Sequence, residues 1–247
     1  MPNKHSKKVQ NAQGTATYAN KIKTMFGSAL VAFWPMNELT GTTAVNTKTA
    51  AATGTYNSVT LANAAGPKGG KLAPLFNGTG SDLNVYSTAL NAVFNGAAGA
   101  IFGWSKVSAA AVWSDATVRY MMYLQVNSSN NVLVYRNTTN GRVTAGYRAG
   151  GAVALAQNVN SLSTTDWMFW VVNFSQAEFS VYYNAAQQGT NQTTAGAWSG
   201  SLGATVCNIG SGSSTPANVW SGWLADWGIL AGRVMTQAEI TKAYTMK

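Results

Sequence analysis

The stretch DWMFWVVNFSQAEFSVYYN, residues 166–184, indicates the fold class of this chain. Its first half, WMFWVVNF (167–174), is apolar on both of its sides, which is typical of a central strand covered on both faces. Its second half, FSVYY (179–183), is rich in β-branched and aromatic residues and predicts another strand. The stretch therefore favours a β-sheet protein.

Working outward, LVAFW (30–34) reads as a further strand that is buried on both faces. Pro35 follows it and ends regular pairing, because proline has no N–H for the ladder. VLVYR (132–136) is another β-rich run. Turn signals recur between such runs, at Asn77-Gly78, Asn95-Gly96, Asn140-Gly141 and Gly150-Gly151. Short strands at this spacing predict a β-sandwich.

Only two helices are predicted. Residues 18–26 place Ile22, Met25 and Phe26 on one side, and Gly27 is the expected stop signal. The second helix is expected to begin with the capping box Thr236-Gln237-Ala238-Glu239 and to carry Ile240 and Tyr244.

The composition excludes several classes of protein. The chain has 247 residues, of which 46% are hydrophobic and 9% are charged, so Thr, Ser, Asn and Gln must cover much of its surface. No stretch is apolar enough to suggest a membrane span. Cys207 is the only cysteine, which excludes an internal disulfide framework. The start MPNKHSKKVQ does not resemble a signal peptide, so we expect intracellular synthesis.

The net charge of +9 is concentrated at the start of the chain. Positions 1–23 contain five lysines and no acid, which makes +5 for this segment: Lys4, Lys7, Lys8, Lys21 and Lys23. The segment is either a solvated tail or an arm that docks on an acidic partner. Its only aromatic residue is Tyr18, which disfavours nucleic acid as the partner. We therefore expect a basic arm over residues 1–27 and a sandwich over 28–247.

Five motifs in order resemble the laminin G-like, concanavalin A-like jelly-roll domains. They are VAFWPMNELTGTTAVN (31–46), LFNGTGSDLNVYS (75–87), AIFGWSKV (100–107), DWMFWVVNFSQAEFSVYYNAAQQ (166–188) and CNIGSG with WSGWLADWGILAGRVMTQAEITKAY (207–244). The resemblance implies an all-β, antiparallel jelly-roll sandwich with a short C-terminal helix.

Calcium is a cofactor that the resemblance implies. The sequence departs from the family pattern in three places. Asn46 stands where Asp is common, the last strand has Ala225 and Asp226 in place of an Asp pair, and the turn that ends at Ala185 lacks the usual glycine. Asp82, Asn84 and Asp226 still offer oxygen atoms, but such residues more often cap turns. We expect no metal and no cofactor.

Catalytic groups are sparse. His5 is the only histidine and lies in the arm, which excludes a Ser-His-Asp arrangement in the sandwich. The seven acids are scattered, and no two are closer than 12 positions, whereas a glycosidase needs two carboxylates at one bond. We predict a protein that is not an enzyme, with a glycoside hydrolase as the remote alternative.

Candidate ligand-binding residues remain. Trp113, Trp198 and Trp220 lie near loops rich in Ser, Gly and Asn, and Asp82 and Asn84 offer polar partners for a sugar. The alternative for each tryptophan is packing.

Two functions from different classes remain open. The first is a non-catalytic assembly protein that forms homo-oligomers in a virion, such as a bacteriophage head decoration protein. It rests on the basic arm, the few surface charges and the lack of catalytic groups. The second is a lectin-like module that binds a surface glycan.

Overall fold

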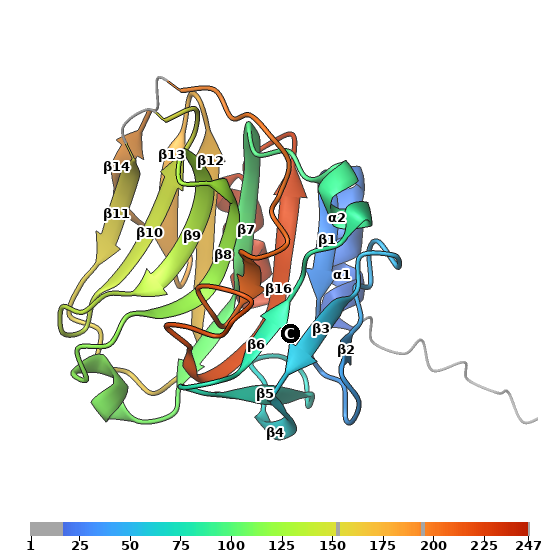
Figure 1. The fold of residues 1–247 in the computed structure, drawn as a ribbon, viewed down its shortest axis with the longest axis vertical. Helices are drawn as coiled ribbons and strands as arrows, with labels where there is room; N and C mark the ends of the chain where they lie inside the picture. Colours follow the sequence, from blue (N-terminus) through green and yellow to red (C-terminus); the bar gives the residue numbers. More distant parts are fainter. Residues whose placement is uncertain (1–16, 152–153, 194–195, 247) are drawn as a thin grey trace, which may run out of the picture.

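The chain folds into two antiparallel β-sheets packed face to face (Figure 1). The structure is a computed structural model that describes residues 17–151, 154–193 and 196–246. Sheet A follows the order β14-β13-β12-β7-β16-β5-β4, with β1 also paired to β16, and sheet B the order β11-β10-β9-β8-β15-β6-β3-β2. This architecture confirms the predicted antiparallel β-sandwich.

The strands of sheet A are β1 (Leu30–Trp34), β4 (Thr60–Ala65), β5 (Leu72–Asn77), β7 (Ala98–Val107), β12 (Met168–Ser175), β13 (Phe179–Tyr183), β14 (Ala186–Gln192) and β16 (Ser221–Ala231). The strands of sheet B are β2 (Thr43–Ala44), β3 (Gly54–Asn57), β6 (Asp82–Asn84), β8 (Arg119–Asn127), β9 (Asn130–Arg136), β10 (Val143–Arg148), β11 (Leu155–Val159) and β15 (Cys207–Ile209). The helices are α1 (Tyr18–Phe26), α2 (Thr88–Val93), α3 (Gln237–Thr245) and two short 3-10 turns, η1 (Gly27–Ala29) and η2 (Ala110–Trp113).

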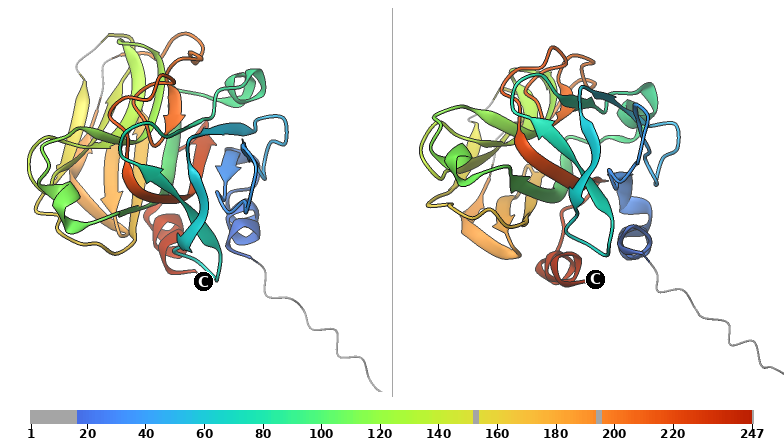
Figure 2. Two further views of the ribbon diagram at one scale, coloured as in Figure 1. Left: turned by 60° about the horizontal axis from the view of Figure 1, so that its bottom comes forward. Right: turned by 90° about the horizontal axis from the view of Figure 1, so that it is seen from below.

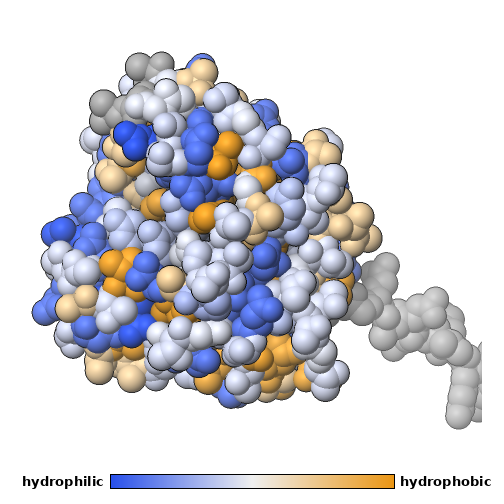
Figure 3. Space-filling view, in the orientation of Figure 1, coloured by the Kyte–Doolittle hydropathy of each residue, from blue (hydrophilic) through white to orange (hydrophobic). Residues whose placement is uncertain are grey.

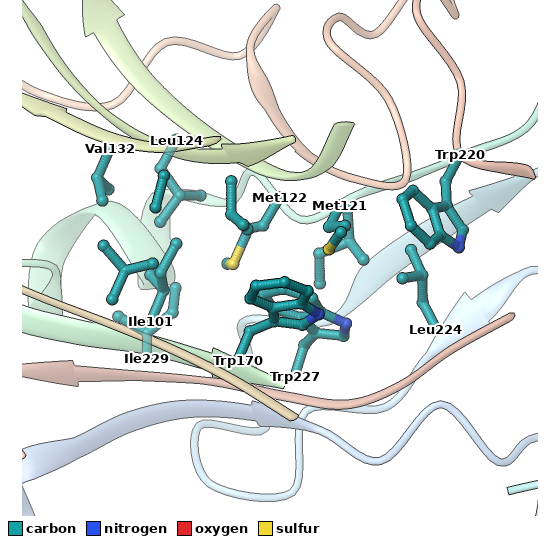
Figure 4. Close-up of a cluster of buried hydrophobic side chains, with 14 of the residues drawn as sticks. Ile101, Met121, Met122, Leu124, Val132, Trp170, Trp220, Leu224, Trp227 and Ile229 are labelled. Carbon is teal, nitrogen blue, oxygen red and sulfur yellow. The ribbon is translucent and has the colours of Figure 1, made fainter. Parts of the chain in front are cut away.

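The main core lies between the two sheets (Figure 4). Ile101, Trp170 and Trp227 from sheet A meet Met122 and Leu124 from sheet B, and all five side chains are fully buried. The inward face of each strand supplies these residues, because side chains alternate between the two faces of a sheet.

A second apolar cluster covers the outer face of sheet A. Tyr18, Ile22 and Phe26 of α1 and Ile240 of α3 pack there against strand residues such as Phe102. Figure 2 shows both helices on the same side of the sandwich. Strands β12 and β1 of sheet A are therefore buried on both faces, which explains why WMFWVVNF and LVAFW show no clean alternation.

The sequence-based elements agree closely with this structure. LVAFW and FSVYY coincide with β1 and β13, and both predicted helices are present, the second with its Thr236–Glu239 capping box. The prediction missed α2, a six-residue helix capped by Ser87, because so short a segment carries no helical periodicity.

Candidate ligand-binding face

The outer face of sheet B is the one broad sheet face that the described helices leave uncovered (Figures 1 and 2). Cys207 and Ile209 of β15 point into the core, so Asn208 between them points outward. Leu83 of β6 points inward in the same way, which places Asp82 and Asn84 on the outer face. Figure 3 views the molecule from this side and shows hydrophilic residues interspersed with apolar ones.

Three tyrosines form a stack on this face, which we call the tyrosine stack. Tyr120 lies in the middle, with its ring centroid 5.0 Å from that of Tyr123 and 5.2 Å from that of Tyr135. A bulge in β8 turns both Met121 and Met122 inward and so leaves Tyr120 and Tyr123 on the same side. All three rings are half-buried, and Tyr120 has a stacking neighbour on each side.

The hydroxyl groups of Tyr120 and Tyr123 remain protonated at neutral pH. Burial, reinforced by the neighbouring phenols of Tyr123 and Tyr135, raises the pKa of Tyr120 to about 12. Burial also raises the pKa of Tyr123. Both residues therefore offer a neutral hydroxyl, which can donate and accept a hydrogen bond.

Polar side chains adjoin the stack in the same register. Asn208 lies opposite Tyr123 of β8 on one side and opposite Asn84 of β6 on the other. Asp82 lies two residues from Asn84 on the same face of β6 and accepts a hydrogen bond from the Asn57 side-chain amide at 3.0 Å. The tyrosine stack therefore lies next to a group of side-chain amides and one carboxyl group.

Three buried polar atoms of this group have no hydrogen-bond partner: Oδ2 of Asp82, and Oδ1 and Nδ2 of Asn208. Both residues are 0% exposed, and burial raises the pKa of Asp82 to about 6. A buried polar group without a partner costs free energy. The three atoms are one donor and two acceptors, a combination that hydroxyl groups can match and that a metal ion cannot, because Nδ2 would still lack an acceptor.

The segment 210–218 closes over this region after β15. The Ser214 N–H donates to the Thr205 carbonyl at 2.9 Å, and the Gly212 N–H donates to the Ala217 carbonyl at 2.8 Å. A side chain at Gly212 would begin 2.9 Å from the Tyr120 ring, so the segment lies directly against the stack.

The structure places the five ligand-binding candidates predicted from the sequence in different surroundings. Asp82 and Asn84 lie on the outer face of sheet B. Trp113 and Trp220 are buried, and their indole N–H groups donate to the Thr164 and Lys106 carbonyls, so neither offers a ring face to a ligand. Trp198 is half-buried and stacks on Tyr147, with ring centroids 6.1 Å apart and planes 3° apart. Trp113 and Trp220 therefore serve packing, which corrects their choice as ligand contacts, whereas Trp198 stays a prediction.

Sequence reasoning missed the tyrosine stack and Asn208. Tyr123 and Tyr135 alternate with core residues in β8 and β9, so the alternation does place both on an outer face. The order of the strands was needed to bring them together, and the bulge at Tyr120 leaves no mark in the sequence. The remaining arm residues are divided: Lys21 and Lys23 lie on α1, whereas Lys4, Lys7 and Lys8 lie outside the described residues.

The residues that the family resemblance points to do not fit a calcium ion. Oδ1 of Asn46 already accepts three backbone N–H groups, those of Phe33, Lys48 and Thr49. Asp226 lies in sheet A, whereas Asp82 and Asn84 lie in sheet B. Over residues 17–151, 154–193 and 196–246, no three His, Cys, Asp or Glu side chains gather at one point.

Two further observations concern nucleophiles and membranes. Cys207 is fully buried, and burial raises the pKa of its thiol to about 12, which disfavours the reactive thiolate. None of the helices in the described part of the chain has the length and apolar character needed to span a membrane.

The chain matches no protein-family model and no curated protein sequence. Its fold is similar to domain 4 of AbnA, an extracellular arabinanase from Geobacillus stearothermophilus, in complex with arabinotriose, with a TM-score of 0.60, 14% identity, and coverage of 87% of this chain and 98% of that domain. It is also similar to Trypanosoma rangeli sialidase in complex with sialic acid (TM-score 0.63, 12% identity, 88% of this chain, 33% of the sialidase). The binding domain of botulinum neurotoxin serotype D gives a TM-score of 0.60 at 12% identity, with 88% of this chain and 51% of that domain covered.

These likenesses establish the β-sandwich fold. The neighbours are β-sandwich domains of carbohydrate-binding and receptor-binding proteins, consistent with a jelly roll. The chain spans a third to a half of the sialidase and toxin chains and nearly all of the arabinanase domain.

Proposed function

We propose that this chain is a non-catalytic module that binds a glycan on the outer face of sheet B. The observation that carries the proposal is the position of the tyrosine stack beside Asn208 and Asn84, on a sheet face without a helical cover. Sugar sites combine an aromatic ring with amide or carboxylate partners, and this face supplies both. Two neighbours in complex with arabinotriose and sialic acid add support at the level of the fold.

The half-buried ring of Tyr123 is the expected contact for an apolar face of a sugar ring. Asn208 and Asn84 lie in the same register as Tyr123, so their amides are placed to meet the hydroxyls of that sugar. The unpaired atoms of Asn208 and Asp82 have the donor and acceptor set that sugar hydroxyls match. Asn208 and Asp82 are fully buried, so a ligand reaches these atoms only when the residues that cover them move aside.

The test is a glycan array followed by calorimetric titration of the sugars that bind. Arabino-oligosaccharides and sialylated glycans are the first ligands to include. Tyr123→Ala is expected to weaken binding at least tenfold, because the loss of one stacked aromatic ring in a sugar site is comparable to a small hot spot. Trp223→Ala, a half-buried aromatic of sheet A, is the matched control and is expected to leave binding unchanged. Absence of any glycan ligand, or equal loss in both variants, would reject the proposal.

The assembly function remains a second prediction from the sequence, including its virion location and its homo-oligomer. It rests on the five lysines of the arm and on the low charge of the remaining chain. Light scattering on the purified protein at low and high salt tests it, since contacts made by lysines weaken as salt screens them. A monomer at every salt concentration would contradict self-assembly.

A further inference from the structure

Lys68 places its ammonium group inside a cage of three aromatic rings on the outer face of sheet A. Its Nζ lies 4.6 Å from the ring centroid of Trp104, 5.7 Å from that of Tyr18 and 5.9 Å from that of Tyr244. The same Nζ donates a hydrogen bond to the Tyr244 carbonyl at 2.5 Å. Aromatic faces at such distances attract cations, and a group of three is the arrangement that proteins use to recognise ammonium ligands.

The walls of this aromatic cage are held by contacts that do not involve Lys68. The Tyr18 hydroxyl donates to the Ala243 carbonyl at 3.2 Å, and the Trp104 indole N–H donates to the Tyr18 hydroxyl at 3.4 Å. The rings of Trp104 and Tyr244 stack with centroids 5.7 Å apart. Strand β7 and helices α1 and α3 therefore position the three rings through contacts of their own.

A buried carboxyl group reinforces the preference of the cage for a cation. Asp226 is 4% exposed and lies at a bulge of β16, beside the residue that pairs with Trp104. Burial raises the pKa of Asp226 to about 7, while the positive charges of Lys71 and Lys68 lower it. Other ionisable groups that face this region are the Tyr18 and Tyr244 phenols, and burial also raises the pKa of Tyr18.

The lysine reaches the cage from the tip of a turn. Lys68 belongs to the connection between β4 and β5, where Gly69 and Gly70 are exposed and adopt positive φ angles of 60° and 71°. The turn is closed at its base by the Gly66 N–H donating to the Lys71 carbonyl at 2.7 Å. Lys68 thus has the geometry of a ligand on a short tether, which competes with any external ligand at a high effective concentration.

We propose that Tyr18, Trp104 and Tyr244 form a binding site for a primary alkylammonium group, and that Lys68 is its tethered occupant. A primary ammonium group, as in a lysine side chain, can both contact the rings and donate to the Tyr244 carbonyl. A quaternary ammonium group has no N–H and loses the second contact. This site lies on the opposite sheet from the proposed glycan face and is independent of it.

The test uses n-butylammonium and tetramethylammonium chloride as probes at neutral pH, measured by calorimetric titration on the full chain. Lys68→Ala is expected to bind n-butylammonium at least tenfold more tightly than the unaltered protein, and tetramethylammonium less tightly than n-butylammonium. Lys106→Ala is the matched control, because Lys106 lies over the single ring of Trp223 at 5.4 Å. This control is expected to bind the probes like the unaltered protein.

A second pair of variants keeps the test decisive. Lys68→Gln retains most of the side-chain length without the charge, and its thermal midpoint is expected to rise with n-butylammonium more than with equal sodium chloride. Adding Tyr244→Leu to the Lys68→Gln variant is expected to abolish that rise in the thermal midpoint. If neither Lys68 variant binds or is stabilised by n-butylammonium, Lys68 is only a structural clamp and the proposal is wrong.

Discussion

Gly103 and Trp227 lie face to face inside the sandwich, and a Cβ atom at Gly103 would sit 2.2 Å from the Trp227 ring. Gly103 belongs to β7 and Trp227 to β16, the most extensively paired strands of sheet A. The indole of Trp227 is fully buried and donates to the Trp104 carbonyl at 3.2 Å, so it has no room to retreat.

Gly103→Ala is therefore expected to lower the free energy of unfolding by about 1–3 kcal/mol, because a forced contact in a packed core displaces both strands. Urea unfolding followed by tryptophan fluorescence measures it. Gly80→Ala is the control, since a Cβ there meets nothing within 4 Å. If the two variants were equally stable, β7 and β16 would be able to shift and accommodate the added methyl group without a measurable loss of stability.

The hairpin between β13 and β14 contains a strained residue. Tyr183 pairs with Ala186, and the two loop residues, Asn184 and Ala185, have φ angles of 47° and 67°. Glycine is the preferred residue at such a position, because an alanine Cβ clashes when φ is positive. Ala185→Gly is expected to raise the free energy of unfolding by about 0.5–1 kcal/mol.

Ala186→Gly provides the comparison for that substitution. Ala186 is an exposed strand residue without a positive φ, so its replacement by glycine only increases the conformational entropy of the unfolded chain. It is expected to lower stability slightly. Both changes are measured as shifts of the thermal midpoint, and a loss of stability in Ala185→Gly would refute the strain argument.

Asp82 makes the stability of the fold depend on pH. Burial raises the pKa of Asp82 from about 3.8 to about 6, so the ionised form is disfavoured in the folded state. The resulting cost is absent below pH 3.8, grows as the pH rises toward 6 and is complete above 6. Asp82→Asn keeps an acceptor for Asn57 and is expected to raise the unfolding free energy by about 1–3 kcal/mol at pH 7.5.

The same comparison at pH 4 is expected to give a much smaller difference, because Asp82 is then largely protonated in the folded protein. Urea unfolding at the two pH values measures both effects. A constant difference would mean that Asp82 does not titrate between pH 4 and 7.5.

The arm and the first helix are expected to behave differently when deleted. Removal of residues 1–16 leaves α1 intact, and we expect no change in the unfolding transition. Removal of residues 1–27 exposes the surface that Tyr18, Ile22 and Phe26 cover, which contributes about 2 kcal/mol for each buried side chain. Urea unfolding of the two truncated proteins compares them. An equal transition for both would show that α1 adds nothing to the sandwich.

Much of the fold could be predicted from the sequence because its signals are local. LVAFW and FSVYY are strands because β-branched and aromatic residues fit a pleated sheet, and Thr236 begins a helix because Glu239 completes its capping box. The candidate site was predicted in part, through Asp82 and Asn84. Trp113 and Trp220 were misjudged because a tryptophan near a polar loop can still turn its ring into the core.

The sequence by itself determined the most apolar strands, the two main helices and the alternation that points Tyr123 and Asn208 away from the core. Only the tertiary structure decided that these two residues lie opposite each other, since β15 enters sheet B between β8 and β6, which precede it by more than 75 positions. It also decided that α1 and α3 cover sheet A and leave the outer face of sheet B open. The physical reason is that alternation along a strand is a local property, whereas the order of strands depends on how distant apolar faces are buried together.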